Sequence, residues 1–249
     1  MQSYIICATP RTGSTLLCGL LAATGRAGRP DSFFMSGMDP AWAAELGLPD
    51  PSGRGTRTHA QAYLDAAIAA GRGDTGIFGL RLMRENLGDL MEMIDLVHPG
   101  QRSDPARLSA AFGDVLCIHL TREDKLAQAV SLVKAEQTGL WHVAPDGTEI
   151  ERLGDPRAPA YDFARIDAQL SELEGYDRAW QDWFAAQGIA PLRIGYETLS
   201  EQPATELARI CAALGIDAPD PGHVAPGVAR LADRTSAEWI ARYRSEAGL

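Results

Sequence analysis

Short apolar runs alternate with stretches of helical periodicity along most of this chain. Four apolar runs have the length of buried strands, at 4–9, 76–83, 115–120 and 191–196. Helical spacing, with proline or a capping residue at the start and glycine at the end, predicts helices at 14–24, 40–46, 58–70, 85–97, 103–112, 124–138, 162–187 (one helix or two), 203–214 and 236–246. Because strands alternate with helices, we expect an α/β three-layer sandwich, a parallel sheet flanked by helices on both faces.

One long segment, 141–161, shows no periodicity. It carries two glycines and three prolines, and we expect a loop there. Loops of this length are often lids or binding segments, so we expect this one to cover an acceptor molecule. The tail from Pro219 is expected to be a loop until Ser236 caps the last helix. No internal repeat or linker interrupts the chain, and we expect a single domain over 1–249.

The composition is that of a globular protein with a strong negative charge. Lys and Arg number 23 against 33 Asp and Glu, a net charge of −10, which argues against nucleic acid or an anionic membrane as a partner. No apolar run is long enough to span a bilayer and no cationic leader opens the sequence, so we expect a cytoplasmic protein. The sequence leaves open whether the protein forms a homodimer. The cysteines lie in apolar runs without metal-ligand spacing, and we expect buried free thiols at Cys7, Cys18, Cys117 and Cys211.

The turn between the first strand and the first helix has the chemistry of an anion site. Backbone N–H groups converge at Gly13 before the helix N-terminus, and the helix dipole adds positive potential. Arg11 supplies a charged fork, and three hydroxyls follow, on Thr12, Ser14 and Thr15. The G-x-x-x-x-G-K-[ST] pattern of nucleotide triphosphatases is absent. The alternative is an ordinary strand-to-helix turn in which Ser and Thr act as caps.

The segment Pro10-Arg11-Thr12-Gly13-Ser14-Thr15-Leu16-Leu17 resembles the 5′-phosphosulfate loop of sulfotransferases, which use 3′-phosphoadenosine-5′-phosphosulfate (PAPS). The resemblance implies a P-loop-like fold and donor contacts from residues 11–15. It also implies catalysis in which Arg11 offsets charge on the leaving group, with no need for a metal.

Two further segments resemble donor-binding elements of the same enzymes. Arg122 at the end of the third strand, with Ser131 in the next helix, is similar to the pair that grips the 3′-phosphate. Tyr196 lies in a segment similar to the element near the adenine. Arg230 and Arg234 fall where the last nucleotide-contacting loop falls. Each has a plain alternative. Arg122 can form a surface ion pair, Ser131 can be a buried helix hydroxyl, the Tyr196 segment can be a strand end with a helix cap, and Arg230 and Arg234 can be solvated charges.

Three segments, 25–34, 137–141 and 238–244, resemble the bacterial trehalose 2-sulfotransferase family, a family of carbohydrate sulfotransferases. This implies sulfuryl transfer from PAPS to a hydroxyl of a carbohydrate or related small acceptor. Two alternatives are a P-loop-type kinase of small molecules, against which the missing Gly-Lys argues, and a non-catalytic binder of nucleotides or anions.

One position departs from the family pattern. The glutamate that serves there as general base is replaced by Ser32, and a hydroxyl is a poor base near neutral pH. Asp31 is the nearest carboxylate and our candidate catalytic base, with His59 and Glu136 as alternatives. Arg81, at the end of the second strand, is a candidate for contact with the sulfuryl group or the acceptor.

Overall fold

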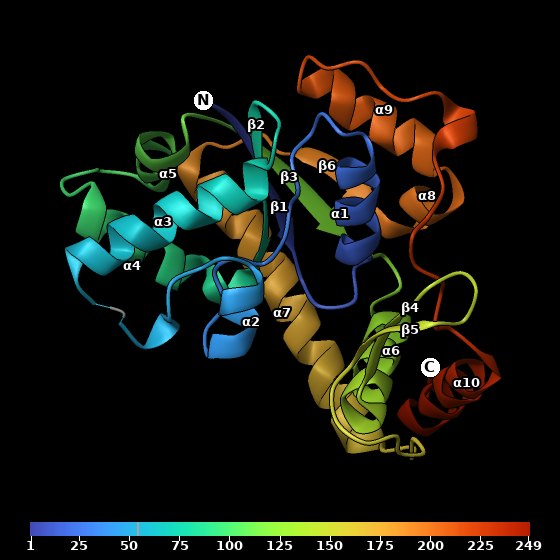
Figure 1. Cartoon of the computed structure of the whole chain (residues 1–249). Coiled ribbons are helices and arrows are strands. Elements are labelled where there is room, and N and C mark those ends of the chain that lie inside the picture. Colours follow the sequence, from blue (N-terminus) through green and yellow to red (C-terminus); the bar gives the residue numbers. More distant parts are fainter. Residues whose placement is uncertain (54) are drawn as a thin grey trace.

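Four parallel strands form the central sheet of the computed structural model, which describes residues 1–53 and 55–249 (Figure 1). They are β1 (Gln2–Ala8), β2 (Ile77–Met83), β3 (Asp114–Thr121) and β6 (Leu192–Gly195), in the order β2-β1-β3-β6. The register pairs Ile5 of β1 with Leu80 on one side and Cys117 on the other. Each end of the four strands lies within two residues of the end of the predicted apolar run. The expected parallel sheet is therefore confirmed.

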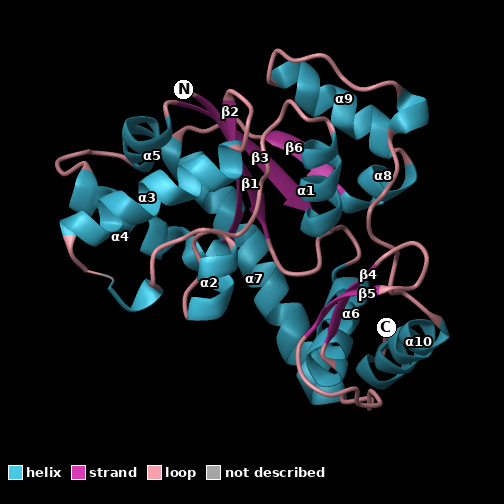
Figure 2. Ribbon diagram, viewed as in Figure 1, coloured by secondary structure: helices cyan, strands magenta, loops and turns pink. Residues whose placement is uncertain are grey.

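Helices cover both faces of this sheet (Figure 2). Ile5 and Cys7 of β1 pack with α3 (Arg57–Arg72), α4 (Leu87–Val97), α5 (Asp104–Phe112) and the second half of α7 (Phe163–Gln187). Tyr4 and Ile6, which point the other way, pack with α1 (Ser14–Ala23) and α9 (Pro203–Ala213). Because successive strand residues face opposite sides, one strand serves two cores, and the three-layer sandwich is confirmed.

A third apolar cluster lies beyond the carboxyl ends of the strands. There α6 (Lys125–Thr138) and the first half of α7 pack with α10 (Arg234–Ala247) through residues such as Val130, Ile166 and Trp239. The segment 162–187, for which one helix or two were open, is a single helix. This cluster holds α6 and α10 beside the edge of the sheet where parallel α/β proteins bind ligands.

Local capping follows the sequence at most helix starts. Asp39 accepts hydrogen bonds from two backbone N–H groups of α2 (Pro40–Glu45). The last helix differs from the expectation, because its cap is Asp233 rather than Ser236. The Ser236 side chain instead contacts the backbone of Asp233, which completes a reciprocal capping box. Short helices complete the chain: α8 (Tyr196–Glu201), and 3₁₀ turns at Pro51–Gly53, Arg84–Asn86 and Pro221–His223.

The segment 141–161 is not the plain loop that we expected. Its first part forms an antiparallel hairpin of β4 (Leu140–Val143) and β5 (Glu149–Arg152). The strands have four residues each and are only partly buried, so they carry too few alternating positions for a pattern to show. Strand β4 of the hairpin contacts α6 (Figure 1).

The four cysteines are buried and unpaired, as predicted. Within the described part of the chain, no helix combines the length and the apolar character needed to cross a membrane.

Candidate active site

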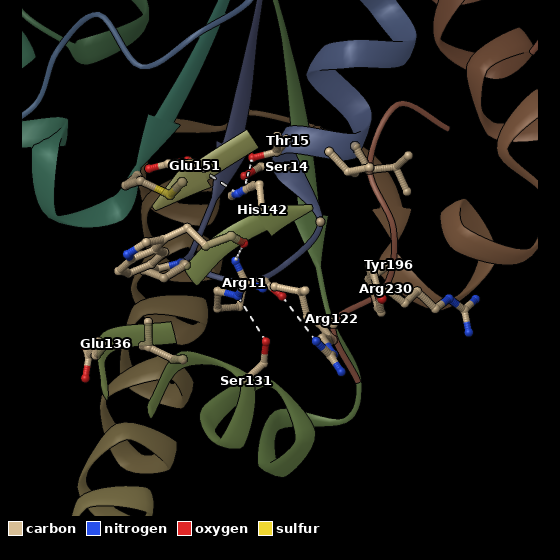
Figure 3. Close-up of a pocket in the computed structure, with 18 of the residues that line it drawn as sticks. Arg11, Ser14, Thr15, Arg122, Ser131, Glu136, His142, Glu151, Tyr196 and Arg230 are labelled. Atoms are coloured by element: carbon tan, nitrogen blue, oxygen red, sulfur yellow. Dashed lines mark hydrogen bonds and ion pairs between the residues drawn. The ribbon is translucent and has the colours of Figure 1, made fainter. Parts of the chain in front are cut away.

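A cavity of about 600 Å³ lies at the carboxyl ends of the strands. Parallel strands bring the loops that follow them to one edge of the sheet, and the hairpin β4–β5 adds a wall (Figure 3). Most residues expected to bind the donor line this cavity, namely Arg11, Gly13, Ser14, Thr15, Arg122, Ser131, Tyr196 and Arg230.

The first loop adopts a conformation that exposes its backbone to the cavity. Arg11 and Gly13 both have positive φ angles, 63° and 81°, and Gly13 is the N-cap of α1. Thr12 lies between them and is fully buried, and its hydroxyl donates to the carbonyl of Thr9 at 2.8 Å. This corrects the expectation that the Thr12 hydroxyl faces an anion, because the proton of that hydroxyl is used in the hydrogen bond that closes the turn.

Arg11 is held in place by neighbours from two other elements. Its Nε donates to Ser131 Oγ at 3.0 Å, and its Nη1 donates to the carbonyl of Trp141 at 2.8 Å. Ser131, expected to act with Arg122, therefore contacts the other arginine of the site. Burial and the nearby charge of Arg122 lower the pKa of Arg11 to about 10, so the guanidinium is still charged at neutral pH.

Arg122 lies over the ring of Tyr196, with 4.5 Å between its Cζ and the ring centroid. Its Nη1 donates to the carbonyl of Arg11 at 3.3 Å, and its buried Nε has no partner. Burial lowers the pKa of Arg122. Among the described residues, no carboxylate lies within ion-pair distance of Arg11 or Arg122. Two adjacent cations without a counter-charge favour binding of an anion.

Arg81 at the end of β2 links three groups around the cavity. It donates from Nη1 to Thr15 Oγ1 at 2.9 Å, from Nε to Ser32 Oγ at 2.8 Å and from Nη2 to Asp31 Oδ1 at 2.9 Å. Asp31 Oδ1 also accepts from the backbone N–H of Ser32 at 2.7 Å. Ser32 lines the cavity and Asp31 does not, so Asp31 sits behind Arg81 and anchors it.

His142 of β4 is a site residue that the sequence did not reveal. Its Nε2 lies 2.7 Å from Thr15 Oγ1, and its Nδ1 lies 3.4 Å from Glu151 Oε2 of β5 (Figure 3). Burial, with the charges of Arg11 and Arg81, lowers the pKa of His142 to about 4. Burial raises the pKa of Glu151. Both residues come from the segment assigned to a loop, and its possible role as a binding segment was the only signal for them.

Carboxylates and aromatic residues line the cavity as well. Glu85 and Glu172 line it, with Tyr176 donating to Glu172 Oε1 at 3.1 Å. Burial raises the pKa of Glu85. The rings of Trp42 and Trp141 line the same space. Carboxylates and indole rings are suited to a neutral ligand rich in hydroxyl groups.

Some candidate residues lie elsewhere or are already engaged. The side chain of Arg234 is 90% exposed, pairs with Glu238 and does not line the cavity. His59 contacts the carbonyl of Asp50 at 2.8 Å, away from the cavity. Glu136 lines the cavity but pairs with Arg165 at 2.8 Å. Arg230 lines it and donates to Ser200 Oγ at 2.7 Å.

Groups of three or more His, Cys, Asp or Glu side chains that could hold a metal ion are not found among the described residues.

A parallel α/β sheet with a tight turn between its first strand and first helix defines a P-loop-like fold, in which the helix N-terminus is suited to an anion. Residues 3–246 match the family model described as Stf0 sulphotransferase. The chain belongs to this sulfotransferase family.

Two curated relatives match almost end to end. A trehalose 2-sulfotransferase of Mycobacterium tuberculosis is 34% identical, over 99% of this chain and 96% of the relative. A trehalose 2-sulfotransferase of Mycolicibacterium smegmatis is 32% identical, over 98% and 95%. Among solved structures, a sulfotransferase domain from the curacin biosynthetic pathway aligns with a TM-score of 0.51 and 13% identity, covering 100% of this chain and 98% of that one. This last likeness supports the fold.

Proposed function

We propose that this protein transfers a sulfuryl group from PAPS to a hydroxyl of a carbohydrate and releases adenosine 3′,5′-bisphosphate. Family membership supports the reaction class, and the relatives named trehalose 2-sulfotransferase support a sugar acceptor. The observation that carries the proposal is the pair Arg11 and Arg122, two half-buried guanidinium groups at the cavity wall. Neither has a carboxylate partner in the part of the chain that the structure describes.

The donor would lie along the strand ends with its two anionic ends apart. Backbone N–H groups of residues 11–15 and the Arg11 fork fit the 5′-phosphosulfate, with the hydroxyls of Ser14 and Thr15 beside them. The partnerless Nε of Arg122 fits the 3′-phosphate, with Ser131 beside it. The Tyr196 ring offers a face for the adenine, and Arg230 closes that end of the cavity.

The chemistry needs positioning and charge stabilisation more than covalent help. The acceptor oxygen attacks sulfur while the bond from sulfur to the 5′-phosphate oxygen breaks, and negative charge grows on that phosphate. Arg11 is placed to offset this charge, since its orientation is set by Ser131 and Trp141 before any ligand arrives. Donors that are fixed in advance cost no reorganisation during the reaction.

The cavity also has side chains suited to a sugar. Glu85 and Glu172 can accept hydrogen bonds from sugar hydroxyls, and Trp42 and Trp141 can cover the apolar faces of sugar rings. The second candidate function is a nucleotide binder without catalysis, which Ser32 at the position of the family's base favours. Both candidates use the same cavity, so activity must separate them.

The test measures transfer of radiolabelled sulfate from PAPS to a panel of sugars that includes trehalose. We expect transfer to at least one sugar, and loss of turnover in Arg11→Ala with the circular dichroism spectrum retained. Arg26→Ala is the matched control, because Arg26 is an exposed arginine paired with Asp217 outside the cavity. Binding of adenosine 3′,5′-bisphosphate without transfer to any sugar would favour the binder, and stabilisation by ATP–Mg²⁺ instead would point to a kinase.

A further inference from the structure

Three side chains from separate elements form a chain of contacts at the sulfuryl end of the cavity. Thr15 belongs to α1, His142 to β4 and Glu151 to β5. The contacts are 2.7 Å from Thr15 Oγ1 to His142 Nε2 and 3.4 Å from His142 Nδ1 to Glu151 Oε2. All three side chains line the cavity (Figure 3).

The hydrogen bonds around Thr15 are compatible with an imidazole that has a free lone pair on Nε2. A guanidinium group can only donate, so Thr15 Oγ1 accepts from Arg81 Nη1 at 2.9 Å. Thr15 Oγ1 can then donate its own proton to His142 Nε2, in the tautomer that carries the imidazole proton on Nδ1. We assign this tautomer because it directs the lone pair of Nε2 at the loop after β1. Nδ1 then lies 3.4 Å from Glu151 Oε2, at ion-pair distance but without a hydrogen bond.

The charges around His142 keep its imidazole ready to receive a proton. Arg11 faces it from the loop after β1, Arg81 from β2 and Glu151 from β5. The two arginines disfavour the imidazolium in the empty site, and the pKa of about 4 reflects burial and their charges. An anion bound between these arginines offsets their charge, so basicity rises when the donor is in place.

We infer that His142 is the general base of the reaction, with Glu151 as its positioning residue. The inference rests on the proposed function. As the acceptor oxygen bonds to sulfur, its proton passes to His142 Nε2, and the electron pair of the breaking sulfur–oxygen bond leaves with the 5′-phosphate. Thr15 turns its hydroxyl from His142 toward the phosphosulfate, which vacates Nε2. Glu151 stabilises the imidazolium that results. Ser32, at the position of the family's general base, takes no part in this proton transfer.

The first experiment compares kcat and nucleotide affinity in His142→Gln. We expect a loss of kcat on the order of 10²- to 10⁴-fold with unchanged affinity for adenosine 3′,5′-bisphosphate. His223→Gln, an exposed histidine outside the cavity, is the control. Wild-type kcat in His142→Gln would overturn the inference and leave the proposed function standing. A wild-type protein that transfers sulfate to no sugar would overturn both.

Two further readouts separate proton transfer from a structural role. In His142→Ala, added imidazoles should restore activity in proportion to their basicity. Restored activity that does not depend on the basicity of the added imidazole would contradict the inference. In Glu151→Gln the imidazolium loses its counter-charge, so the acid limb of kcat should move to lower pH. Glu149→Gln changes a residue on the same strand that pairs with Arg152 outside the cavity, and it should leave the acid limb of the kcat profile unchanged. If the acid limb also stays unchanged in Glu151→Gln, Glu151 has no role in the mechanism.

Discussion

The ring of Tyr196 lies against Gly13 so closely that a Cβ atom on Gly13 would come within 2.6 Å of Tyr196 Cδ2. Gly13 also has a φ of 81°, in the left-handed region. The guanidinium of Arg122 lies over the same ring. The turn at Gly13, the Tyr196 ring proposed for the adenine and the Arg122 guanidinium proposed for the 3′-phosphate are therefore one packed unit. Glycine at position 13 is required both by the backbone conformation and by the space available.

Gly13→Ala should disturb this unit. A side chain in the left-handed region costs about 1–2 kcal/mol, and the ring of Tyr196 must also move. We expect a lower free energy of unfolding in urea and weaker binding of adenosine 3′,5′-bisphosphate by calorimetry. Gly19→Ala is the matched control, because it lies in α1 with no neighbour within 4 Å of an added Cβ. It should gain about 0.5–1 kcal/mol. Equal behaviour of the two variants would contradict the packing argument.

Arg122→Ala should weaken nucleotide binding selectively. Loss of a charge-assisted contact costs about 1.5–3 kcal/mol, and only a ligand with a 3′-phosphate makes that contact. Calorimetry should show a large loss for adenosine 3′,5′-bisphosphate and a small one for adenosine 5′-monophosphate. Arg122→Lys keeps the charge and should fall between wild type and Arg122→Ala. Equal losses for the two ligands would remove Arg122 from the 3′-phosphate site.

Asp31→Asn distinguishes the sequence-based candidate for the base from His142. Asp31 accepts from Arg81 and from the backbone of Ser32, so its change to asparagine should loosen Arg81 and reduce kcat much less than His142→Gln does. Nucleotide affinity should be kept. A loss on the order of 10²- to 10⁴-fold in steady-state kinetics, as for removal of a base, would instead return that role to Asp31.

Ser32→Glu offers a gain of function. Ser32 is 3% exposed, lines the cavity and accepts from Arg81 Nε at 2.8 Å, at the position where the resemblance implies a catalytic glutamate. In the His142→Gln background, Ser32→Glu should restore part of the lost kcat. Ser32→Gln has the same size without a basic oxygen and should restore none. Identical rates for the two double variants would mean that position 32 cannot supply a base here.

The depressed pKa of His142 predicts a pH-dependent stability. In the unfolded chain this group has its ordinary pKa of 6.5, against about 4 in the fold. The unfolded state therefore binds more protons between these values, and the free energy of unfolding should fall as pH drops through that window. Burial raises the pKa of Glu151, which contributes stability of the opposite pH sign, present at low pH and lost as pH rises. Urea titrations at about pH 7 and about pH 5 should show a smaller pH-dependent loss in His142→Gln than in wild type. The same loss in both proteins would contradict the lowered pKa.

Much of the framework follows from local sequence. The strand Gln2–Ala8 and the helix Ser14–Ala23 are read from an apolar run followed by helical spacing, and Gly13 marks the turn. The order of strands and helices implies a parallel sheet, and a parallel sheet implies a site at its carboxyl edge. Arg11 could be named from the chemistry of the turn that follows the first strand, and Arg122 and Tyr196 from the resemblance of their segments to donor-binding elements of sulfotransferases.

Tertiary structure alone decided what those residues touch. The Thr12 hydroxyl turned inward to close its own turn, and Ser131 became a partner of Arg11, 120 positions away in the chain. The contact between Thr15 and His142 spans 127 positions and depends on a hairpin too short to leave a periodic pattern. Periodicity reports which face of an element is buried, whereas the identity of a long-range partner depends on how the packed layers bring separate loops together. The turn that we propose for anion binding could therefore be located from the sequence, whereas the imidazole of His142 beside it could be found only in the fold.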